Sequence, residues 1–432
     1  MTLDVLKSDS RAGRRAVERL IRRGETVLDT ETLRRAGKIV ADVRQRGDRA
    51  LLEYARKLDG VDPSVGLALA PMAEDADRSR LPSGFAEALE RAILAVERFH
   101  APQARTGYRL DDEDGVELEE LVTPLRRVGV YVPGGRAAYP STVVMTVVPA
   151  RVAGVREIAV ATPPGSYRAN AALRYTLERL GIEEIWGMGG AHAVAALAYG
   201  TETIQRVDKI VGPGNAWVTA AKKLVFGDVA VDGIAGPSEV VIVADETADP
   251  GDLAADLLAQ AEHDPRAAAV LITTDAKLAK RVAKEIEKQL ESLSTAATAR
   301  ASLKAFGAAL IVPSLEEAAL LVDRIAPEHL QLVGPAAETL AGRIANAGAV
   351  FLGPSTPEVF GDYIAGPSHV LPTCGSARFA SALGVEDFLR RSHRVRFSRA
   401  AASHRAAAAR FSATSRLMRS GRSQGTSFWS SL

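Results

Sequence analysis

The chain has 432 residues, of which 47% are hydrophobic and 25% charged, with a formal net charge of +1. These values exclude a disordered chain or a coiled coil as a description of the whole, and they give no general case for nucleic-acid binding. Cys374 is the single cysteine, no apolar run approaches the ~18 residues that span a bilayer, and the N-terminus lacks the apolar core of a signal peptide, so we expect a cytoplasmic protein without disulfides or membrane segments.

The first hundred residues read as helices. Thr30 is placed to cap a helix that Gly47 ends, and apolar side chains recur between them at helical spacing. Ser83 is placed in the same way to cap a helix that runs to His100.

Short apolar runs that alternate with helical stretches follow from residue 127 onward. Most end in Gly or Pro, which is typical of an α/β fold with mostly parallel sheets. Nine such units suggest two α/β domains. The runs occupy 127–133, 157–164, 184–190, 208–215, 238–245, 268–275, 307–314, 329–334 and 348–354.

Two glycine-rich turns follow expected strands, at 131–135 and 211–215. The second opens a helix, and a helix N-terminus after such a turn can hold a phosphate. Neither turn has the G-x-G-x-x-G spacing, so tight turns between strand and helix are the alternative.

Three further groups could carry chemistry. Gln260 and His263 stand three apart on an expected helix and could ligate a divalent metal, or could form an ordinary polar helix end. Glu328 and His329 stand where an expected helix meets an expected strand, and could be an acid/base pair or surface polar residues. Asp362, in a glycine-rich loop, could ligate a metal or cap a helix.

Long blocks of the sequence closely resemble the histidinol dehydrogenase family. They include VGVYVPGG, GMGGAHAVAALAYGTE, DKIVGPGNAWVTAAKK, GIAGPSE, LLAQAEHDP, RIAPEHLQL and GDYIAGPSHVLPTCGSARF, and the likeness runs from about residue 30 to about residue 400. It implies two incomplete Rossmann-like domains with an aldehyde-dehydrogenase-like architecture, an intertwined homodimer, and oxidation of L-histidinol through L-histidinal to L-histidine with NAD and one Zn²⁺ per subunit.

The resemblance also implies roles for residues in the matching blocks. Glu328 and His329 become the catalytic pair, Gln260, His263 and Asp362 become zinc ligands, and Ser238 joins the zinc ligands and His329 in contacting substrate. Tyr131, His192 and Asn215 become NAD contacts, with His192 standing where the family usually has Gln.

The implied domains follow the same blocks. Residues 1–25 form an N-terminal helical segment, 26–129 with 239–380 a first α/β domain that holds the zinc and catalytic residues, and 130–238 a second on the NAD side. Residues 381–432 form a C-terminal dimerisation tail.

That tail departs from the family after about Arg399. From Phe388 to Leu432 there are ten Arg and ten Ser but no Lys, Asp or Glu, while the other 387 residues carry 44 basic and 53 acidic side chains. The family's tail carries a substrate-contacting Glu and, five residues later, a fourth zinc ligand, a His; here the last His is His404. We favour translation in a shifted frame, and a divergent basic tail that binds an anionic partner is the alternative.

Two other functions remain open at this point. A catalytically dead homologue would follow from the loss of the tail's Glu and His. A dehydrogenase of another small polar alcohol would follow from the loss of the substrate-contacting Glu alone.

Overall fold

The computed structural model describes residues 3–62, 64, 66–70, 79–112, 115–134 and 139–402, apart from the side chains of Thr26 and Asp362. The chain forms two compact units: residues 1–103 with 125–388, and residues 104–124 with those from 389 onward. Among the described residues, no helix is long and apolar enough to cross a membrane.

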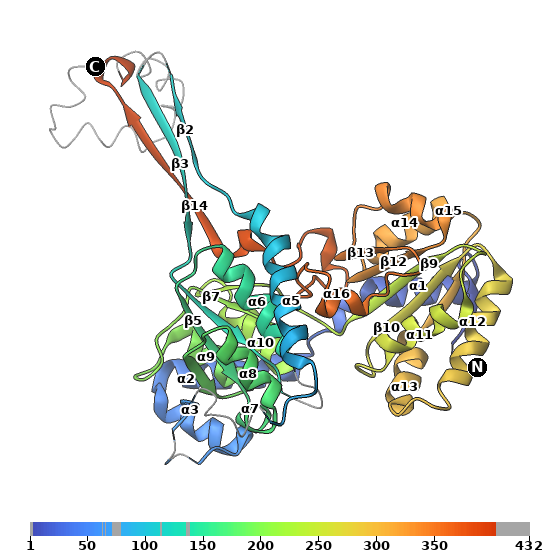
Figure 1. Cartoon of the computed structure of the whole chain (residues 1–432), viewed down its shortest axis with the longest axis horizontal. Coiled ribbons are helices and arrows are strands. Elements are labelled where there is room, and N and C mark those ends of the chain that lie inside the picture. Colours follow the sequence, from blue (N-terminus) through green and yellow to red (C-terminus); the bar gives the residue numbers. More distant parts are fainter. Residues whose placement is uncertain are drawn as a thin grey trace. The chain divides into compact units, whose positions relative to one another are not determined.

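A six-stranded parallel sheet organises one part of the first unit (Figure 1). Its order is β1 (Val5–Lys7), β11 (Ala308–Ile311), β10 (Ala268–Thr273), β9 (Glu239–Ala244), β12 (His329–Val333) and β13 (Ala349–Leu352). The chain builds outward from β9 to β11, then returns to the other side of β9 for β12 and β13. The order therefore reverses between β9 and β12.

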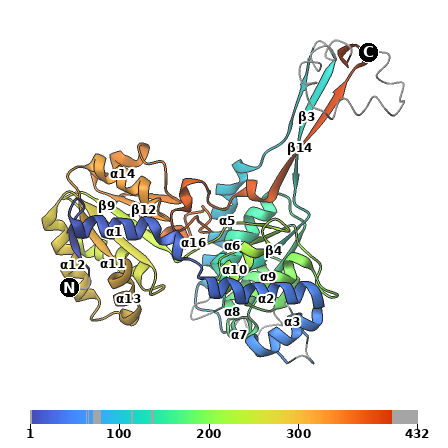
Figure 2. The ribbon, with the colours of Figure 1, turned by 180° about the vertical axis from the view of Figure 1, so that it is seen from behind.

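Both faces of this sheet are covered, because successive side chains of a strand point to opposite faces. In β9, Val240 and Ile242 pack with α11 (Pro250–Ala261), α12 (Ala276–Gln289) and α13 (Ala296–Phe306). Val241 and Val243 pack with α1 (Arg11–Ile21) and α14 (Leu315–Ile325). Figure 2, which shows the molecule from behind, has α1 in front of the sheet.

A five-stranded parallel sheet organises the rest of the unit. Its order is β6 (Glu184–Gly187), β5 (Glu157–Thr162), β4 (Arg127–Tyr131), β7 (Lys209–Val211) and β8 (Ala230–Val231). One face carries α5 (Phe85–His100), α6 (Pro140–Val152) and α8 (Ala171–Arg179), and α7 (Pro164–Ala169) joins α8. The order reverses between β4 and β7.

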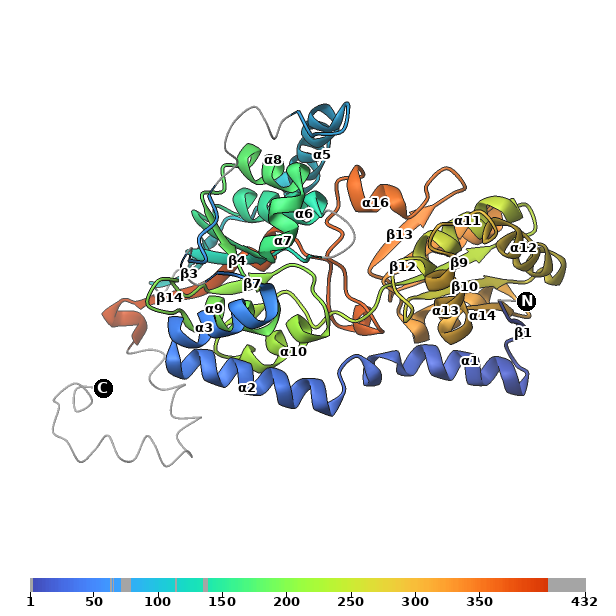
Figure 3. The ribbon, with the colours of Figure 1, turned by 90° about the horizontal axis from the view of Figure 1, so that it is seen from below.

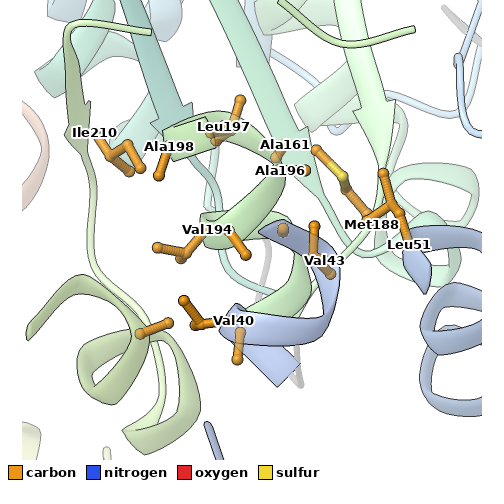
Figure 4. Packing of buried hydrophobic residues seen from close by; sticks show 14 of the residues in the cluster. Val40, Val43, Leu51, Ala161, Met188, Val194, Ala196, Leu197, Ala198 and Ile210 are labelled. Carbon is orange, nitrogen blue, oxygen red and sulfur yellow. The ribbon is translucent and has the colours of Figure 1, made fainter. Parts of the chain in front are cut away.

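The other face is covered by α9 (Gly190–Tyr199), α10 (Ala216–Val225), α2 (Thr30–Arg46) and α3 (Asp48–Tyr54). Val40 and Val43 of α2 pack around Val194 and its neighbours on α9 (Figure 4). The predicted first domain joined residues 26–129 to residues 239–380. In the structure, however, α2 and α3 pack on the sheet formed by residues 127–231. Figure 3 shows α1 and α2 one after the other along the first unit. Helix α1 packs on the six-stranded sheet, and α2 packs on the five-stranded sheet.

The nine expected strands are all present, so the prediction of an α/β fold with parallel sheets is confirmed. Two caps were wrong. Asp29, not Thr30, caps α2 by accepting from the Thr32 N–H, and α5 begins after Gly84 without a side-chain cap.

The second unit is a three-stranded antiparallel sheet in the order β14 (Leu389–Phe397), β3 (Val116–Pro124) and β2 (Tyr108–Asp111). Alternation gives it two unlike faces. One is charged, with Arg394 and Arg396 placed opposite Glu119 and Glu117. The other, the apolar face, carries the exposed side chains of Tyr108, Leu110, Leu118, Val395 and Phe397, together with the Glu120–His393 ion pair.

Candidate active site

The Glu328–His329 pair lies at the amino edge of the six-stranded sheet, where the strand order reverses. His329 is the first residue of β12 and stands opposite Val240 of β9. Ser238 directly precedes β9, and its carbonyl accepts from the Ala268 N–H of β10. The topology therefore gathers Ser238, Glu328 and His329 at one end of three neighbouring strands.

The His329 ring is buried and held by the backbone. Its Nδ1 lies 3.2 Å from the Glu239 carbonyl oxygen, which accepts the Nδ1–H. The neutral ring therefore carries its proton on Nδ1 and a lone pair on Nε2, so Nε2 is the nitrogen that can accept a proton. Nδ1 also lies 3.9 Å from a carboxylate oxygen of Glu328 and 3.9 Å from one of Glu358, so a protonated ring would be stabilised.

Glu328 is equally enclosed. Its Oε2 accepts the N–H of Glu239 at 3.1 Å, and its carbonyl accepts the N–H of Ala349 in β13. The carboxylate and the imidazole are therefore fixed beside each other in a dry environment, where acid/base chemistry is efficient.

Gln260 stands in the last turn of α11, at the same edge of the sheet. Its side chain is buried, and its Oε1 has no hydrogen-bond partner among the described residues. A buried amide oxygen without a donor is costly unless a ligand or metal satisfies it. Gln260 thus has the chemistry of a ligand site.

The other expected zinc ligands are His263, three residues further along the chain, and Asp362, in a separate helix. The helix ends at Ala261 rather than continuing through His263, so the exposed His263 lies in the turn after α11. Asp362 belongs to α16 (Val359–Tyr363), which begins next to Glu358, but its side chain lies outside the described part. Among the side chains that are described, no three of His, Cys, Asp or Glu form a metal cluster. An amide oxygen, an imidazole and a carboxylate are donors that zinc accepts, so the residues fit that metal.

The five-stranded sheet presents a different site, at the carboxyl ends of β4 and β7. In open parallel sheets, ligands bind where the strand order reverses. Tyr131 ends β4, and Gly212 follows β7 with φ of +106° and a Cβ position only 2.2 Å from the Tyr131 carbonyl oxygen. Only glycine fits there, which explains the turn.

Each residue assigned to NAD is placed around this turn. The Tyr131 hydroxyl accepts the Gly190 N–H at 3.1 Å, and burial raises the pKa of Tyr131 to about 12. Asn215 caps α10 by accepting the N–H groups of Trp217 and Val218. The cap orders the helix N-terminus, which is the anion-binding end.

His192 is almost completely buried and is bonded to Asp59. Its Nε2 lies 2.7 Å from an oxygen of Asp59, and the same oxygen accepts the Gly189 N–H. The side chain is 1% exposed. Asp59 therefore holds His192 against the β6–α9 turn.

Several functional neighbours escaped the sequence reasoning. Arg23, Asp59, Glu358 and Asp232 stand outside the quoted blocks, and Lys222 lies in one of them without a spacing that points to a role. Glu239 offered one signal, because it follows Ser238 in the GIAGPSE block, but only the fold shows that its side chain turns inward.

Cys374 is not placed for nucleophilic chemistry. Its Sγ lies 3.6 Å from the Pro237 carbonyl oxygen, and burial together with the charge of Glu239 raises the pKa of the thiol to about 12. The thiol therefore stays protonated near neutral pH.

The sequence and the fold of this chain are both similar to those of known proteins. A model of the histidinol dehydrogenase family matches residues 22–423, so the match continues past Arg399, after which the tail was expected to depart from the family. The histidinol dehydrogenase of Geobacter sulfurreducens is 49% identical over 364 residues, covering 84% of this chain and 85% of the relative. That of Geobacillus kaustophilus is 46% identical over 376 residues, covering 86% and 88%. The crystal structure of histidinol dehydrogenase from Elizabethkingia anophelis superposes with a TM-score of 0.84 at 32% identity, covering 94% of this chain and 92% of that one.

Proposed function

The chain belongs to the histidinol dehydrogenase family and is an enzyme of histidine biosynthesis, and from this premise we propose how its own residues oxidise L-histidinol. The reaction is a four-electron oxidation through L-histidinal to L-histidine, uses two NAD⁺, and takes place in the cytoplasm. The observation that carries the proposal is the enclosed Glu328–His329 pair, with the His329 Nδ1–H given to the Glu239 carbonyl.

In the first oxidation, His329 is the base. The alcohol carbon loses a hydride to NAD⁺ while Nε2 of His329 takes the hydroxyl proton, which leaves the aldehyde. The imidazolium that results is stabilised by the carboxylates of Glu328 and Glu358, each with an oxygen 3.9 Å from Nδ1.

In the second oxidation, Glu328 is the base. A water loses one proton to the Glu328 carboxylate as its oxygen adds to the aldehyde carbon, which leaves the anion of the hydrate. This anion loses a hydride to the second NAD⁺, and the carboxylic acid that results releases its proton to leave the carboxylate of L-histidine. The enclosed site keeps the reactive aldehyde from bulk water between the two steps.

Gln260, His263 and Asp362 would hold the zinc ion, and Ser238 would contact the substrate beside them. When bound, zinc would supply a fixed positive centre that orients the substrate's imidazole and amine. The buried oxygen of Gln260 supports this assignment, because a metal would satisfy it.

Tyr131, His192 and Asn215 would line the NAD site. The reversal of strand order between β4 and β7 and the ordered N-terminus of α10 support it.

A homodimer is also part of the proposal. The second unit has a charged face and an apolar face, and an exposed apolar sheet face needs a partner. A second copy of this chain, presenting the same face, would cover it.

Two substitutions test the roles of the pair. We expect His329→Asn to lower histidinol-dependent NADH formation at least about 100-fold, because a general base contributes 10²–10⁴-fold. We expect Glu328→Gln to lower histidinal-dependent NADH formation by about as much. Glu316→Gln, on the exposed surface of α14, is the matched control and should leave both rates unchanged.

Near-normal histidinol turnover in folded His329→Asn would overturn the assignment of the first base. Near-normal histidinal turnover in Glu328→Gln would overturn that of the second.

A further inference from the structure

Arg23 is a buried cation in the N-terminal segment, outside the sequence blocks quoted above. It belongs to the 3₁₀ turn Arg22–Thr26 after α1, and its guanidinium forms an ion pair with the carboxylate of Glu239 at the start of β9. Both side chains are 3% exposed. The guanidinium also donates to the carbonyl oxygens of Pro237 at 3.1 Å and Arg266 at 2.7 Å.

The carboxylate of Glu239 bonds to three different residues. One oxygen pairs with Arg23, and the other accepts the Cys374 N–H at 2.8 Å and the Glu328 N–H at 3.3 Å. A carboxylate can accept several hydrogen bonds, and accepting from backbone N–H groups fixes the loops that carry them.

The backbone of Glu239 completes the link to the catalytic pair. Its N–H donates to the Glu328 carboxylate at 3.1 Å, and its carbonyl accepts from His329 Nδ1 at 3.2 Å. Glu239 and Glu328 are therefore joined reciprocally, each N–H bonded to the other's carboxylate. One residue thus sets the position of Glu328 and the tautomer of His329.

Stability alone is a poor reason for this arrangement. Removing two charges from water costs several kcal/mol per ion, and apolar residues of similar volume often serve as well. A buried pair that also holds the reacting groups is better explained by positioning.

We propose that Glu239, anchored by Arg23, is a positioning residue that holds the Glu328–His329 pair in its reactive geometry. The inference rests on the function proposed above for that pair. Neither Arg23 nor Glu239 touches the reacting atoms in this account, and both act through Glu328 and His329. Misplacing catalytic groups by about 1 Å can cost 100-fold in rate.

Two charge-neutral double variants and one charge-conserving variant test it. Arg23→Met/Glu239→Gln keeps an acceptor oxygen for the N–H groups of Glu328 and Cys374, whereas Arg23→Met/Glu239→Met removes it. We expect the glutamine variant to keep kcat within about threefold of wild type, and the methionine variant to lose about 10- to 100-fold in kcat with less than twofold change in either KM.

Glu239→Asp serves if the methionine variant does not fold. It keeps the negative charge but withdraws the whole carboxylate by one methylene, both from Arg23 and from the N–H groups of Glu328 and Cys374. A positioning role predicts a fall of about tenfold or more in the kcat of the folded protein, whereas a merely structural role predicts a lower thermal stability with an unchanged kcat.

A double-mutant comparison tests whether Glu239 acts through Glu328. In a Glu328→Gln background, Glu239→Asp should cost less than twofold in histidinal-dependent kcat, because residues that act through one another are not additive. Full additivity, or wild-type kcat in folded Glu239→Asp, would overturn the proposal. Wild-type histidinol turnover is measured first: its absence refutes the proposed function, whereas its presence with unaffected Glu239 variants refutes this inference alone.

Discussion

At the scale of single residues, the site depends on which atom carries each proton. The Glu239 carbonyl takes the Nδ1–H of His329, so the reactive nitrogen is chosen by a backbone atom that no substitution at residue 239 removes. Side-chain changes at Glu239 therefore test positioning without abolishing the tautomer.

Cys374 gives a prediction at the same scale. Because burial holds the thiol pKa at about 12, the native protein should react with a thiol reagent at pH 8 at least about 100 times more slowly than the unfolded chain. The measurement is the rate of disulfide exchange with a chromogenic reagent, with and without denaturant. Equal rates would show that the thiol is open to solvent.

At the scale of elements, the turn between β7 and α10 is held by a buried ion pair. Lys222 of α10 and Asp232 after β8 lie 2.6 Å apart; Lys222 also donates to the Gly212 carbonyl, and Asp232 accepts the Gly212 N–H. The two residues clamp the glycine turn from both sides, so the proposed NAD site depends on them.

Breaking this clamp should affect stability and cofactor binding together. Asp232→Asn leaves the Lys222 ammonium buried without its counter-charge, and we expect the free energy of unfolding to fall by about 3 kcal/mol or more. In the folded fraction, the KM for NAD⁺ should rise more than the KM for histidinol. Denaturant titration and steady-state kinetics measure the two effects, and the neutral pair Lys222→Met/Asp232→Asn is the control that should recover part of the stability. An unchanged unfolding midpoint in Asp232→Asn would contradict the account.

His100, at the C-terminal end of α5, predicts a pH dependence. Burial lowers its pKa below the ordinary 6.5, although the Val96 carbonyl at 2.9 Å from Nδ1 opposes the shift. The unfolded chain therefore binds the proton first, and stability falls as the pH drops below about 6.5, by at most about 1.4 kcal/mol per pH unit for one group. Above that pH the residue contributes no slope.

The test compares unfolding free energies of wild type and His100→Gln between pH 7.5 and 5.5. The difference between the two proteins should stay constant above pH 6.5 and shift in favour of the variant below it. Parallel curves over the whole range would rule out His100 as a source of acid sensitivity.

The elements also show what sequence could and could not foretell. Each of the nine expected strands was found, because a strand buried on both faces, such as Glu239–Ala244, is a continuous apolar run. The three strands of the second unit were missed, because charged side chains interrupt their apolar pattern and because β14 pairs with β3, which lies far from it in the sequence. The position of α2 was missed as well, since an amphipathic pattern shows that a helix is covered but not which sheet covers it.

Some residues of the site could likewise be predicted from the sequence, and others could not. Glu328, His329 and Gln260 could be named from motifs, and the fold buries each of them at the amino edge of one sheet. Arg23 and Glu358 could not be named, because they reach the pair only through tertiary contacts.

At the scale of the whole molecule, the second unit bears on assembly. Val395 is 59% exposed on the apolar face of β14, whereas Arg396 next to it belongs to the charged face. We expect the protein to sediment as a dimer, Val395→Glu to shift it toward monomer, and Arg396→Gln to leave it unchanged. Analytical ultracentrifugation measures this, and a monomeric wild type would refute the dimer.

The central claim is that this chain performs both oxidations of L-histidinol. The most direct measurement is the stoichiometry of the purified protein with L-histidinol, NAD⁺ and added zinc, with NADH followed by absorbance and products by chromatography. We expect two NADH for each L-histidine formed and no accumulation of histidinal. One NADH with released histidinal, or no histidinol-dependent NADH at all, would contradict it.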